Sequence, residues 1–200
     1  GGMVTTNDEV LWRAMWSFKD HGKSYAAVYE REHAPGFRWL HESFGTNWRM
    51  LEMQAVIGRI QLQRMAGWTA TRTRYAEQIW AACRSHSALH VPEVPANVQH
   101  AHYKCYAYVR PEQLAAGWNR DRIVAAINAL GVPCYQGSCS EVYMEKAFDG
   151  TGWRPAAPLP TAHALGTTSV MFLVHPTLTQ AEVDTTCTAI AQVMQQATAA

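Results

Sequence analysis

Residues 44–58 hold the side chains of this sequence that are best suited to binding an anion. Gly45 permits a tight backbone turn, and Thr46 and Asn47 are residue types that cap the start of a helix. An apolar run at helical spacing follows, so we expect a helix to begin near Trp48. Because the first turn of a helix carries unpaired N–H groups and the positive end of its dipole, the pattern indicates an anion-binding corner beside Asn47. An ordinary capped core helix is the alternative.

Cysteine and histidine side chains, which bind metals or form disulfides, follow no recognised motif here. The sequence has five scattered cysteines without a CxxC pair: Cys83, Cys105, Cys134, Cys139 and Cys187. Reduced thiols in a cytoplasmic protein are the simplest interpretation. A Cys134–Cys139 disulfide and a metal site at His100, His102 and Cys105 are alternatives, but no further ligands stand at motif distance.

Composition narrows the function classes further. A chain of 200 residues with 48% hydrophobic content can bury a core, as one domain or two small ones. The 17 basic and 16 acidic residues leave no excess charge for a nucleic acid. Apolar runs such as 169–174 are far shorter than the roughly 20 residues that span a bilayer, and no secretion signal opens the chain. These features predict a soluble cytoplasmic protein without a membrane or nucleic-acid partner.

The elements before the corner are predicted from apolar spacing. Residues 2–6 are typical of a short buried strand, and residues 7–20 of an amphipathic helix with a core-facing stripe. Residues 23–43 lose this periodicity and form a long functional loop that carries Tyr25, Tyr29, Phe37 and Trp39. Two uses of these aromatics remain open: they clamp the loop to the body, or they form a lip for a substrate.

Two helices are predicted after the corner. The first, residues 48–65, is apolar around more than half its circumference, so it is deeply buried or lies at a subunit interface. Gly67 is expected to end it, and residues 68–84 form a second helix that acts as a strut between domains. Residues 90–99 contain two prolines and no period, which indicates a linker.

The last hundred residues predict a small α+β layer. Residues 101–109 alternate as a strand, and residues 133–136 and 169–174 are two further strands. One helix begins at Arg120 and ends at Gly131, and Thr179 caps a final helix that runs to about Gln196. Helices are expected to cover one face of a mostly antiparallel sheet.

Three segments resemble motifs of the DegT/DnrJ family of pyridoxal-phosphate-dependent sugar aminotransferases. Residues 44–58 resemble its Gly-Tyr-Asn-Tyr-Arg-Met-x-Glu-x-Gln-Ala-x-x-Gly signature, with Phe44, Thr46 and Trp48 as variants. Residues 1–8 resemble the strand that follows the family's cofactor-binding lysine, and residues 173–179 resemble its C-terminal signature. The three motifs occur in the family's order along the whole chain.

The resemblance implies an α/β fold, namely the C-terminal part of a type I aminotransferase. Residues 1–66 would be the end of the large domain that binds pyridoxal 5′-phosphate, residues 67–99 the linking helix and linker, and residues 100–200 the small C-terminal α+β domain.

The resemblance also implies site residues. The family's asparagine that matches Asn47 reaches the cofactor phosphate of the neighbouring subunit in a homodimer. The charge of Arg49 suits a phosphate or a substrate, and an ion pair with Glu52, three residues on, is the alternative. Arg38 suits the diphosphate of a nucleotide-linked substrate. His102 matches a position that often faces the cleft, although a buried core histidine is the alternative. Tyr135, with Ser140 and Tyr143, stands where many members have histidines, so it is a substrate candidate whose contacts are in doubt.

The activity implied is transfer of an amino group, commonly from glutamate, to a keto group of a nucleotide-linked sugar, in polysaccharide biosynthesis. In the family the cofactor-binding lysine precedes the opening glycines, and Lys19, Lys23 and Lys104 do not match it. We therefore assign no catalytic residue and expect the chain alone to be inactive. Two alternatives remain: a pyridoxal-phosphate-dependent sugar dehydratase of the same fold, and a non-catalytic module that binds a nucleotide sugar or a partner helix.

Overall fold

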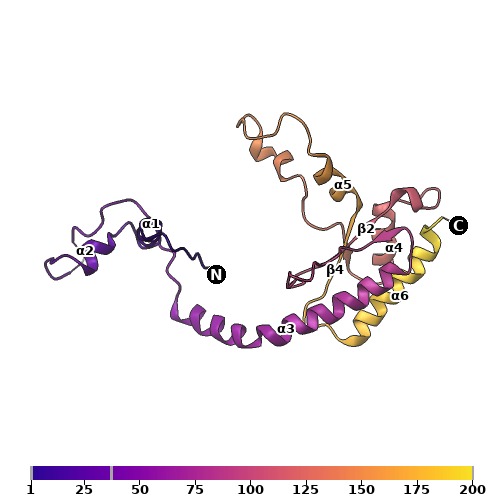
Figure 1. The fold of residues 1–200 in the computed structure, drawn as a ribbon, viewed down its shortest axis with the longest axis horizontal. Helices are drawn as coiled ribbons and strands as arrows, with labels where there is room; N and C mark the ends of the chain where they lie inside the picture. The colour runs from indigo at the N-terminus through magenta and orange to yellow at the C-terminus, as the bar shows by residue number, and fades with distance from the viewer. Residues whose placement is uncertain (1, 37, 200) are drawn as a thin grey trace. The chain divides into compact units, whose positions relative to one another are not determined.

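The chain forms two compact units, Gly1–Arg64 and Met65–Ala200, which are described separately (Figure 1). The structure is a computed structural model that describes residues 2–36 and 38–199. Helix α3, Glu52–Arg84, crosses the boundary between the units. The assignment of residues 1–66, 67–99 and 100–200 to a large domain, a linker and a small domain stays a prediction.

The first unit opens without the strand that we expected. Residues 2–6 have no strand assignment, and all of them except Thr6 are exposed. The strand prediction is wrong for a physical reason: an extended segment needs a neighbouring strand for its backbone groups, and no described residue of this unit provides one. Helix α1, Glu9–Lys19, follows as predicted, with the Asp8 carboxylate accepting a hydrogen bond from the Leu11 N–H. Its expected core-facing stripe is not buried, because α1 holds no buried residue.

The stretch 23–43 is not a structureless loop. Ser24 caps a short helix α2, Tyr25–Tyr29, and Lys23 and His41 form an isolated bridge. Tyr25 packs edge-on against Trp12 and Trp16 of α1, with ring centroids 4.9 and 5.2 Å apart. This contact supports the clamp interpretation for Tyr25, whereas Trp39 is 91% exposed and Phe37 lies outside the described residues.

Helix α3 is one continuous helix of 33 residues, so the predicted start at Trp48 and the predicted break at Gly67 are both wrong. A single glycine costs a helix only about 1 kcal/mol, which the flanking turns offset. A Cβ at Gly67 would meet nothing within 4 Å. The apolar residues of its first half are exposed in the structure: Met53, Val56, Ile57, Ile60, Leu62 and Met65. Deep burial within the described chain is therefore wrong, and the subunit-interface alternative stays a prediction.

The second unit is built on a four-stranded antiparallel sheet in the order β1-β2-β4-β3. Its strands are β1 (Leu89–His90), β2 (Cys105–Val109), β3 (Cys134–Tyr135) and β4 (Ser169–Phe172). The three predicted strands are confirmed in place but are shorter than expected. Strand β1 was missed because two residues beside a proline-rich linker show no alternation.

The described part of the second unit contains three α-helices besides the end of α3. Helix α4, Arg120–Ala129, and helix α6, Gln180–Ala197, begin and end near the predicted residues, and Gly131 adopts the expected positive φ of 80°. Thr179 and Glu182 form a complete capping box at the start of α6. Helix α5, Pro160–Thr168, was not predicted, nor were the short 3₁₀ helices Pro111–Gln113, Val142–Met144 and Lys146–Phe148.

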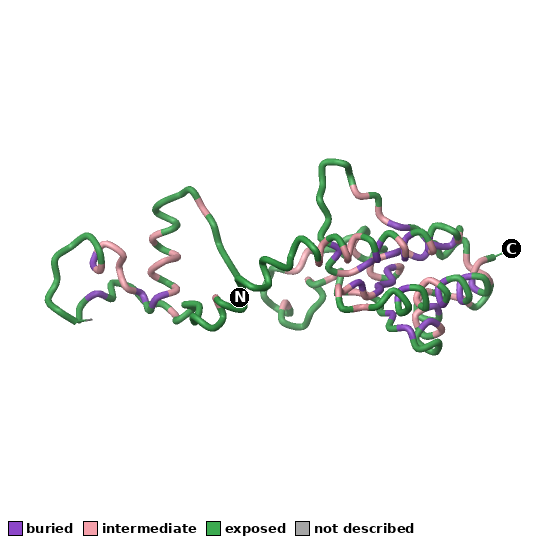
Figure 2. Tube along the Cα trace, turned by 90° about the horizontal axis from the view of Figure 1, so that it is seen from below, coloured by how far each residue is buried: buried purple, intermediate pink, exposed green. Residues whose placement is uncertain are grey.

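The core of the second unit lies between the sheet and helices α3, α4 and α6. Alternate residues of β2 face it, namely Cys105, Ala107 and Val109. The C-terminal half of α3 contributes Tyr75, Ala76, Ile79, Trp80 and Cys83. Figure 2 shows that buried residues are concentrated in this unit. No helix within residues 2–36 and 38–199 is long and apolar enough to cross a membrane.

Candidate functional site

The predicted corner forms where the turn after α1 meets residues 43–48. The His21 N–H donates to the Thr46 carbonyl at 2.8 Å, and the Thr46 N–H donates to the Phe18 carbonyl at 2.6 Å. A Cβ at Gly22, whose φ is +80°, would lie 1.8 Å from the Ser43 carbonyl oxygen. Glycine is therefore required at this position for the close backbone approach.

The corner is not the start of a helix. Asn47 forms an isolated bridge with Asp20, and the Trp48 N–H donates to the Lys19 carbonyl at 2.9 Å. These tertiary bonds hold residues 47–48 out of the helix, so α3 begins at Glu52 instead. The helix dipole and its N–H groups therefore do not act at Asn47, and any affinity for an anion must come from side chains.

Three side chains contact Arg49, and Lys23 joins the group through Asp20. Arg49 Nε donates to Asn47 Oδ1 at 3.2 Å, and Arg49 Nη1 lies 3.3 Å from the carboxylate oxygen Oδ1 of Asp20. His21 Nε2 lies 3.4 Å from Arg49 Nη2, and Lys23 Nζ lies 3.6 Å from Asp20 Oδ1. Arg49 thus pairs with Asp20 rather than with Glu52, which was the alternative partner.

The exposed amide of Asn47 keeps an unused donor. Arginine only donates hydrogen bonds, so the amide oxygen must face Arg49 and the NH₂ group must face away. That NH₂ group donates no hydrogen bond to the described residues. An unused donor beside a guanidinium is the arrangement that binds a phosphate oxygen.

Arg38 is not part of this group. It lies exposed beyond α2 and makes no hydrogen bond or ion pair with the residues that the structure describes. Its assignment to a substrate diphosphate stays a prediction.

His102, in the second unit, is 3% exposed and has a φ of +45°. Its ring packs edge-on against Trp80 at 5.2 Å, and the His100 ring lies 4.3 Å away. Burial, together with the nearby His100, lowers the pKa of His102, so the neutral imidazole is favoured. The Nδ1 atom has no hydrogen-bond partner within the described part of the chain. These contacts support a packed histidine that retains one unused polar atom.

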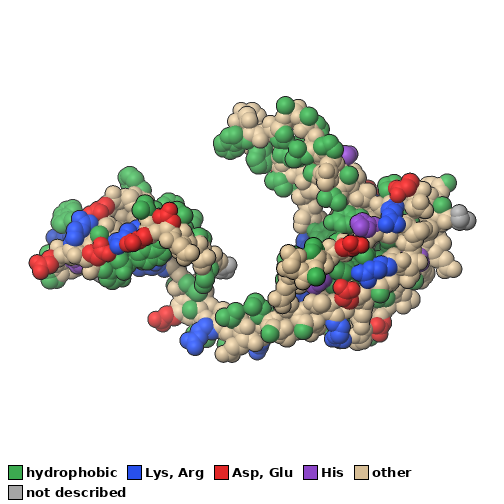
Figure 3. Space-filling model, viewed as in Figure 1, with side chains coloured by type: hydrophobic (Ala, Val, Ile, Leu, Met, Phe, Trp, Pro, Cys, Tyr) green, Lys and Arg blue, Asp and Glu red, His purple; other side chains and the backbone are tan. Residues whose placement is uncertain are grey.

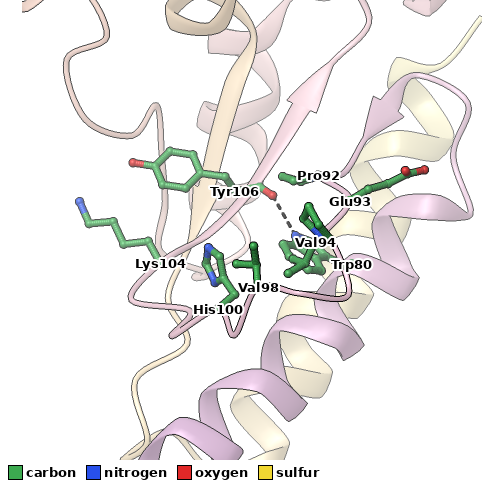
Figure 4. Close-up of a pocket in the computed structure, with 9 residues that line it drawn as sticks. Trp80, Pro92, Glu93, Val94, Val98, His100, Lys104 and Tyr106 are labelled. Carbon is green, nitrogen blue, oxygen red and sulfur yellow. Dashed lines mark hydrogen bonds between the residues drawn. The ribbon is translucent and has the colours of Figure 1, made fainter.

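A small pocket of about 140 Å³ lies beside these rings (Figure 4). Trp80 forms one wall, and its indole N–H donates to the Tyr106 carbonyl at 2.8 Å. Val94, Val98 and His100 line it as well. Tyr135, the remaining substrate candidate, is exposed on β3 opposite Met171 and does not line this pocket. The structure therefore does not bring His102 and Tyr135 into one site.

Several polar residues were missed by the sequence patterns. Asp20, His21 and Lys23 support the corner, and their only signal was a cluster of titratable residues around a glycine after α1. In the second unit, Glu141 accepts hydrogen bonds from Tyr143 at 2.7 Å and from His163 at 3.0 Å. Lys146, a lysine that was also overlooked, lies exposed in the third 3₁₀ helix.

All five cysteines are free in the structure. Across residues 2–36 and 38–199, no three histidine, cysteine or acidic side chains are grouped so that they could hold a metal ion. The histidine and cysteine positions therefore give no support to the disulfide or metal alternatives.

The sequence of this chain is similar to those of curated bacterial proteins. The GDP-perosamine synthase of Caulobacter vibrioides is 28% identical over 97% of this chain, which covers 48% of that protein. The UDP-N-acetyl-3-dehydro-alpha-D-glucosamine 3-aminotransferase of Acidithiobacillus ferrooxidans is 31% identical over 66% of the chain, which covers 30% of that protein. The chain thus spans about half or less of the length of these curated relatives.

Solved structures of aminotransferases have the same fold as this chain. The aminotransferase from Psychrobacter cryohalolentis is 61% identical, with a TM-score of 0.88 over 96% of this chain and 50% of that one. The pyridoxal-phosphate form of the sugar aminotransferase Spr1654 from Streptococcus pneumoniae, described as putative in its own report, shares the fold with a TM-score of 0.74 at 15% identity. The α/β aminotransferase fold that the resemblance implied is confirmed.

The sequence model of the DegT/DnrJ/EryC1/StrS aminotransferases matches residues 1–191, which is nearly the whole chain. One of the two curated relatives is named as an aminotransferase of a UDP-linked sugar, in agreement with the family that the three sequence motifs resemble. The chain belongs to the DegT/DnrJ/EryC1/StrS aminotransferase family.

Proposed function

We propose that this chain is part of an enzyme that moves an amino group from glutamate to a keto group of a nucleotide-linked sugar. The observation that carries the proposal is the corner at Asn47 and Arg49, where an exposed amide and a guanidinium offer donors to a phosphate. The names of two relatives support the substrate class, since one contains a GDP-linked sugar and the other a UDP-linked keto-sugar.

The corner's role in this proposal is binding and orientation. Pyridoxal phosphate, when bound, supplies the chemistry by taking an amino group from the donor and passing it to the keto carbon. Asn47 Nδ2 would donate to its phosphate, and Arg49, which holds the amide oxygen of Asn47, would add positive charge beside it. We place that phosphate in the neighbouring subunit of a homodimer, by analogy with the family. No residue of this chain is assigned the catalytic lysine, so the chain alone should not turn over.

Amino transfer is tested with the longer protein that contains this chain. The purified protein is loaded with pyridoxal phosphate and given glutamate and a UDP- or GDP-linked keto-sugar. Formation of the amino-sugar together with an equal amount of 2-oxoglutarate, followed by mass spectrometry, is expected. Loss of water from the sugar without consumption of glutamate would instead identify a dehydratase.

The role of Asn47 has a separate test. In the longer protein, Asn47→Ala should weaken cofactor binding by about 1–3 kcal/mol, because a buried phosphate loses a hydrogen-bond donor. The dissociation constant is measured by titration with pyridoxamine 5′-phosphate, which does not depend on a covalent link. Asn7→Ala, at an exposed asparagine of the same unit, is the control and should bind normally. An unchanged constant for Asn47→Ala would reject the phosphate role.

A further inference from the structure

We propose that Asp20 is a positioning residue that acts through Arg49 to turn the amide NH₂ group of Asn47 toward the phosphate. The proposal rests on the function proposed above and adds a residue to its phosphate corner. Asp20 does not itself face the ligand, because its side chain is almost wholly buried.

Asp20 is the buried charge at the centre of the corner. The residue is 7% exposed, and its Oδ1 atom makes no hydrogen bond within the described residues. It instead lies 3.3 Å from Arg49 Nη1 and 3.6 Å from Lys23 Nζ. A buried carboxylate is costly unless cations compensate it, so Asp20 holds these two cationic groups in place. The restraint matters most for Arg49, whose side chain is 47% exposed.

Arg49 converts this restraint into an orientation. Its guanidinium is a rigid planar fork, so fixing Nη1 at Asp20 also fixes the direction of Nε. Nε donates to Asn47 Oδ1 at 3.2 Å, which excludes the flipped amide, since that rotamer would set two donors against each other. The NH₂ group is thereby left pointing away from the protein. If the Asp20 charge is lost, Arg49 is free to move and either amide orientation becomes accessible.

The backbone of the corner does not depend on the carboxylate. Asp20 and Asn47 are joined by a backbone bridge, and Gly22 and Gly45 allow the same two segments to touch. Asp20→Asn therefore removes the charge, keeps the side-chain shape and leaves the backbone contacts available. This separates the electrostatic role of Asp20 from its place in the fold.

The test uses the longer protein and the dissociation constant of pyridoxamine 5′-phosphate. Asp20→Asn is expected to weaken binding about fivefold or more, which corresponds to the loss of one oriented hydrogen bond. In an Asn47→Ala background the same change should have no further effect, because Asp20 acts only through that amide. Glu30→Gln is the matched control, because it removes an ion pair with Arg13 in the same unit, away from the corner. It should leave the constant unchanged.

Arg49→Lys provides a second variant at a more exposed position. It keeps the positive charge but lacks the Nε donor, so it should weaken binding like Asp20→Asn and also be silent without Asn47. It remains informative if Asp20→Asn fails to fold.

Two results would overturn the inference alone. One is normal binding by Asp20→Asn or by Arg49→Lys while Asn47→Ala binds weakly. The other is a full additional loss in the double variants, which would mean that the charge acts on the phosphate independently of the amide. Normal binding by Asn47→Ala would instead remove the proposed phosphate role itself, and the inference with it.

Discussion

At the scale of single residues, burial divides the cysteines into reactive and protected thiols. Burial raises the pKa of Cys83 and of Cys134 to about 12, and that of Cys105 is raised as well. Cys139 is exposed, and Cys187 is half-buried with a raised pKa. The thiolate is the reactive form of cysteine, so the buried thiols of Cys83, Cys105 and Cys134 are unreactive at neutral pH.

We therefore predict that iodoacetamide at pH 8 modifies Cys139 first, as followed by peptide mapping of the native protein. Cys83, Cys105 and Cys134 should be labelled only after denaturation, because their thiols are both inaccessible and protonated. Cys139→Ser should abolish the early phase and leave the rest unchanged. Early labelling of Cys134 in the native protein would show that the sheet opens far more easily than its burial indicates.

Residue types predicted local caps well where no distant partner competes. Thr179 caps α6 and Gly131 follows the end of α4 with a positive φ, as the sequence indicates. At Asn47 the same reasoning failed, because the Trp48 N–H is bonded to the Lys19 carbonyl, 29 positions earlier. The role of Asp20 could not be predicted either, because the sequence does not show which cationic side chains will lie beside a buried carboxylate.

At the scale of elements, α3 shows how a long helix overrides one unfavourable residue. Periodicity located both of its halves, but glycine was interpreted as a break because it lowers helix propensity. In the structure the hydrogen-bonded ladder passes through Gly67, whose position is exposed. The helical character of both segments could thus be predicted from the sequence, but the start and the continuity of α3 could not, because they depend on tertiary contacts and on how both ends are held.

This continuity predicts the effect of Gly67→Ala. A Cβ there meets nothing within 4 Å, so alanine should stabilise α3 by about 0.5–1 kcal/mol. Hydrogen exchange of the peptides around Gly67 should slow by a corresponding amount. Gly45→Ala is a contrasting variant, since its Cβ would lie 2.4 Å from the Gly22 nitrogen, and it should disrupt the corner. Faster exchange in Gly67→Ala would show that another backbone approaches the helix at this point.

At the scale of the whole molecule, the two units differ in how they bury apolar surface. The second unit has a continuous core, whereas the first exposes many large apolar side chains: Met3, Val4, Val10, Phe44, Trp48, Met50 and Leu51. Figure 3 shows hydrophobic side chains gathered on the surface of the first unit and over the segment that leads to α5. Contiguous exposed apolar surface indicates contact with further protein.

The same contrast explains which parts of the fold were predictable. The sheet and helices of the second unit satisfy their own hydrogen bonds and bury their own apolar faces, so local patterns match the outcome. In the first unit, the apolar pattern of residues 2–6 and of α1 was interpreted as burial that no described residue provides. An apolar pattern in the sequence predicts that a face of an element will be buried, but it does not identify the residues or the chain that will bury it.

The relatives suggest what covers it, because the solved aminotransferase from Psychrobacter cryohalolentis is about twice as long as the matched region. We predict that the 200-residue chain expressed alone binds a hydrophobic dye such as ANS strongly, and that the longer protein does not. In the longer protein, Ile57→Glu should lower the dimer fraction measured by light scattering, because it places a charge on the exposed apolar face of α3. Glu93→Gln, an exposed change in the second unit, is the control. Weak dye binding by the isolated chain would mean that its exposed apolar side chains form no contiguous surface. A dimer fraction unchanged by Ile57→Glu would mean that the apolar face of α3 is not a subunit interface.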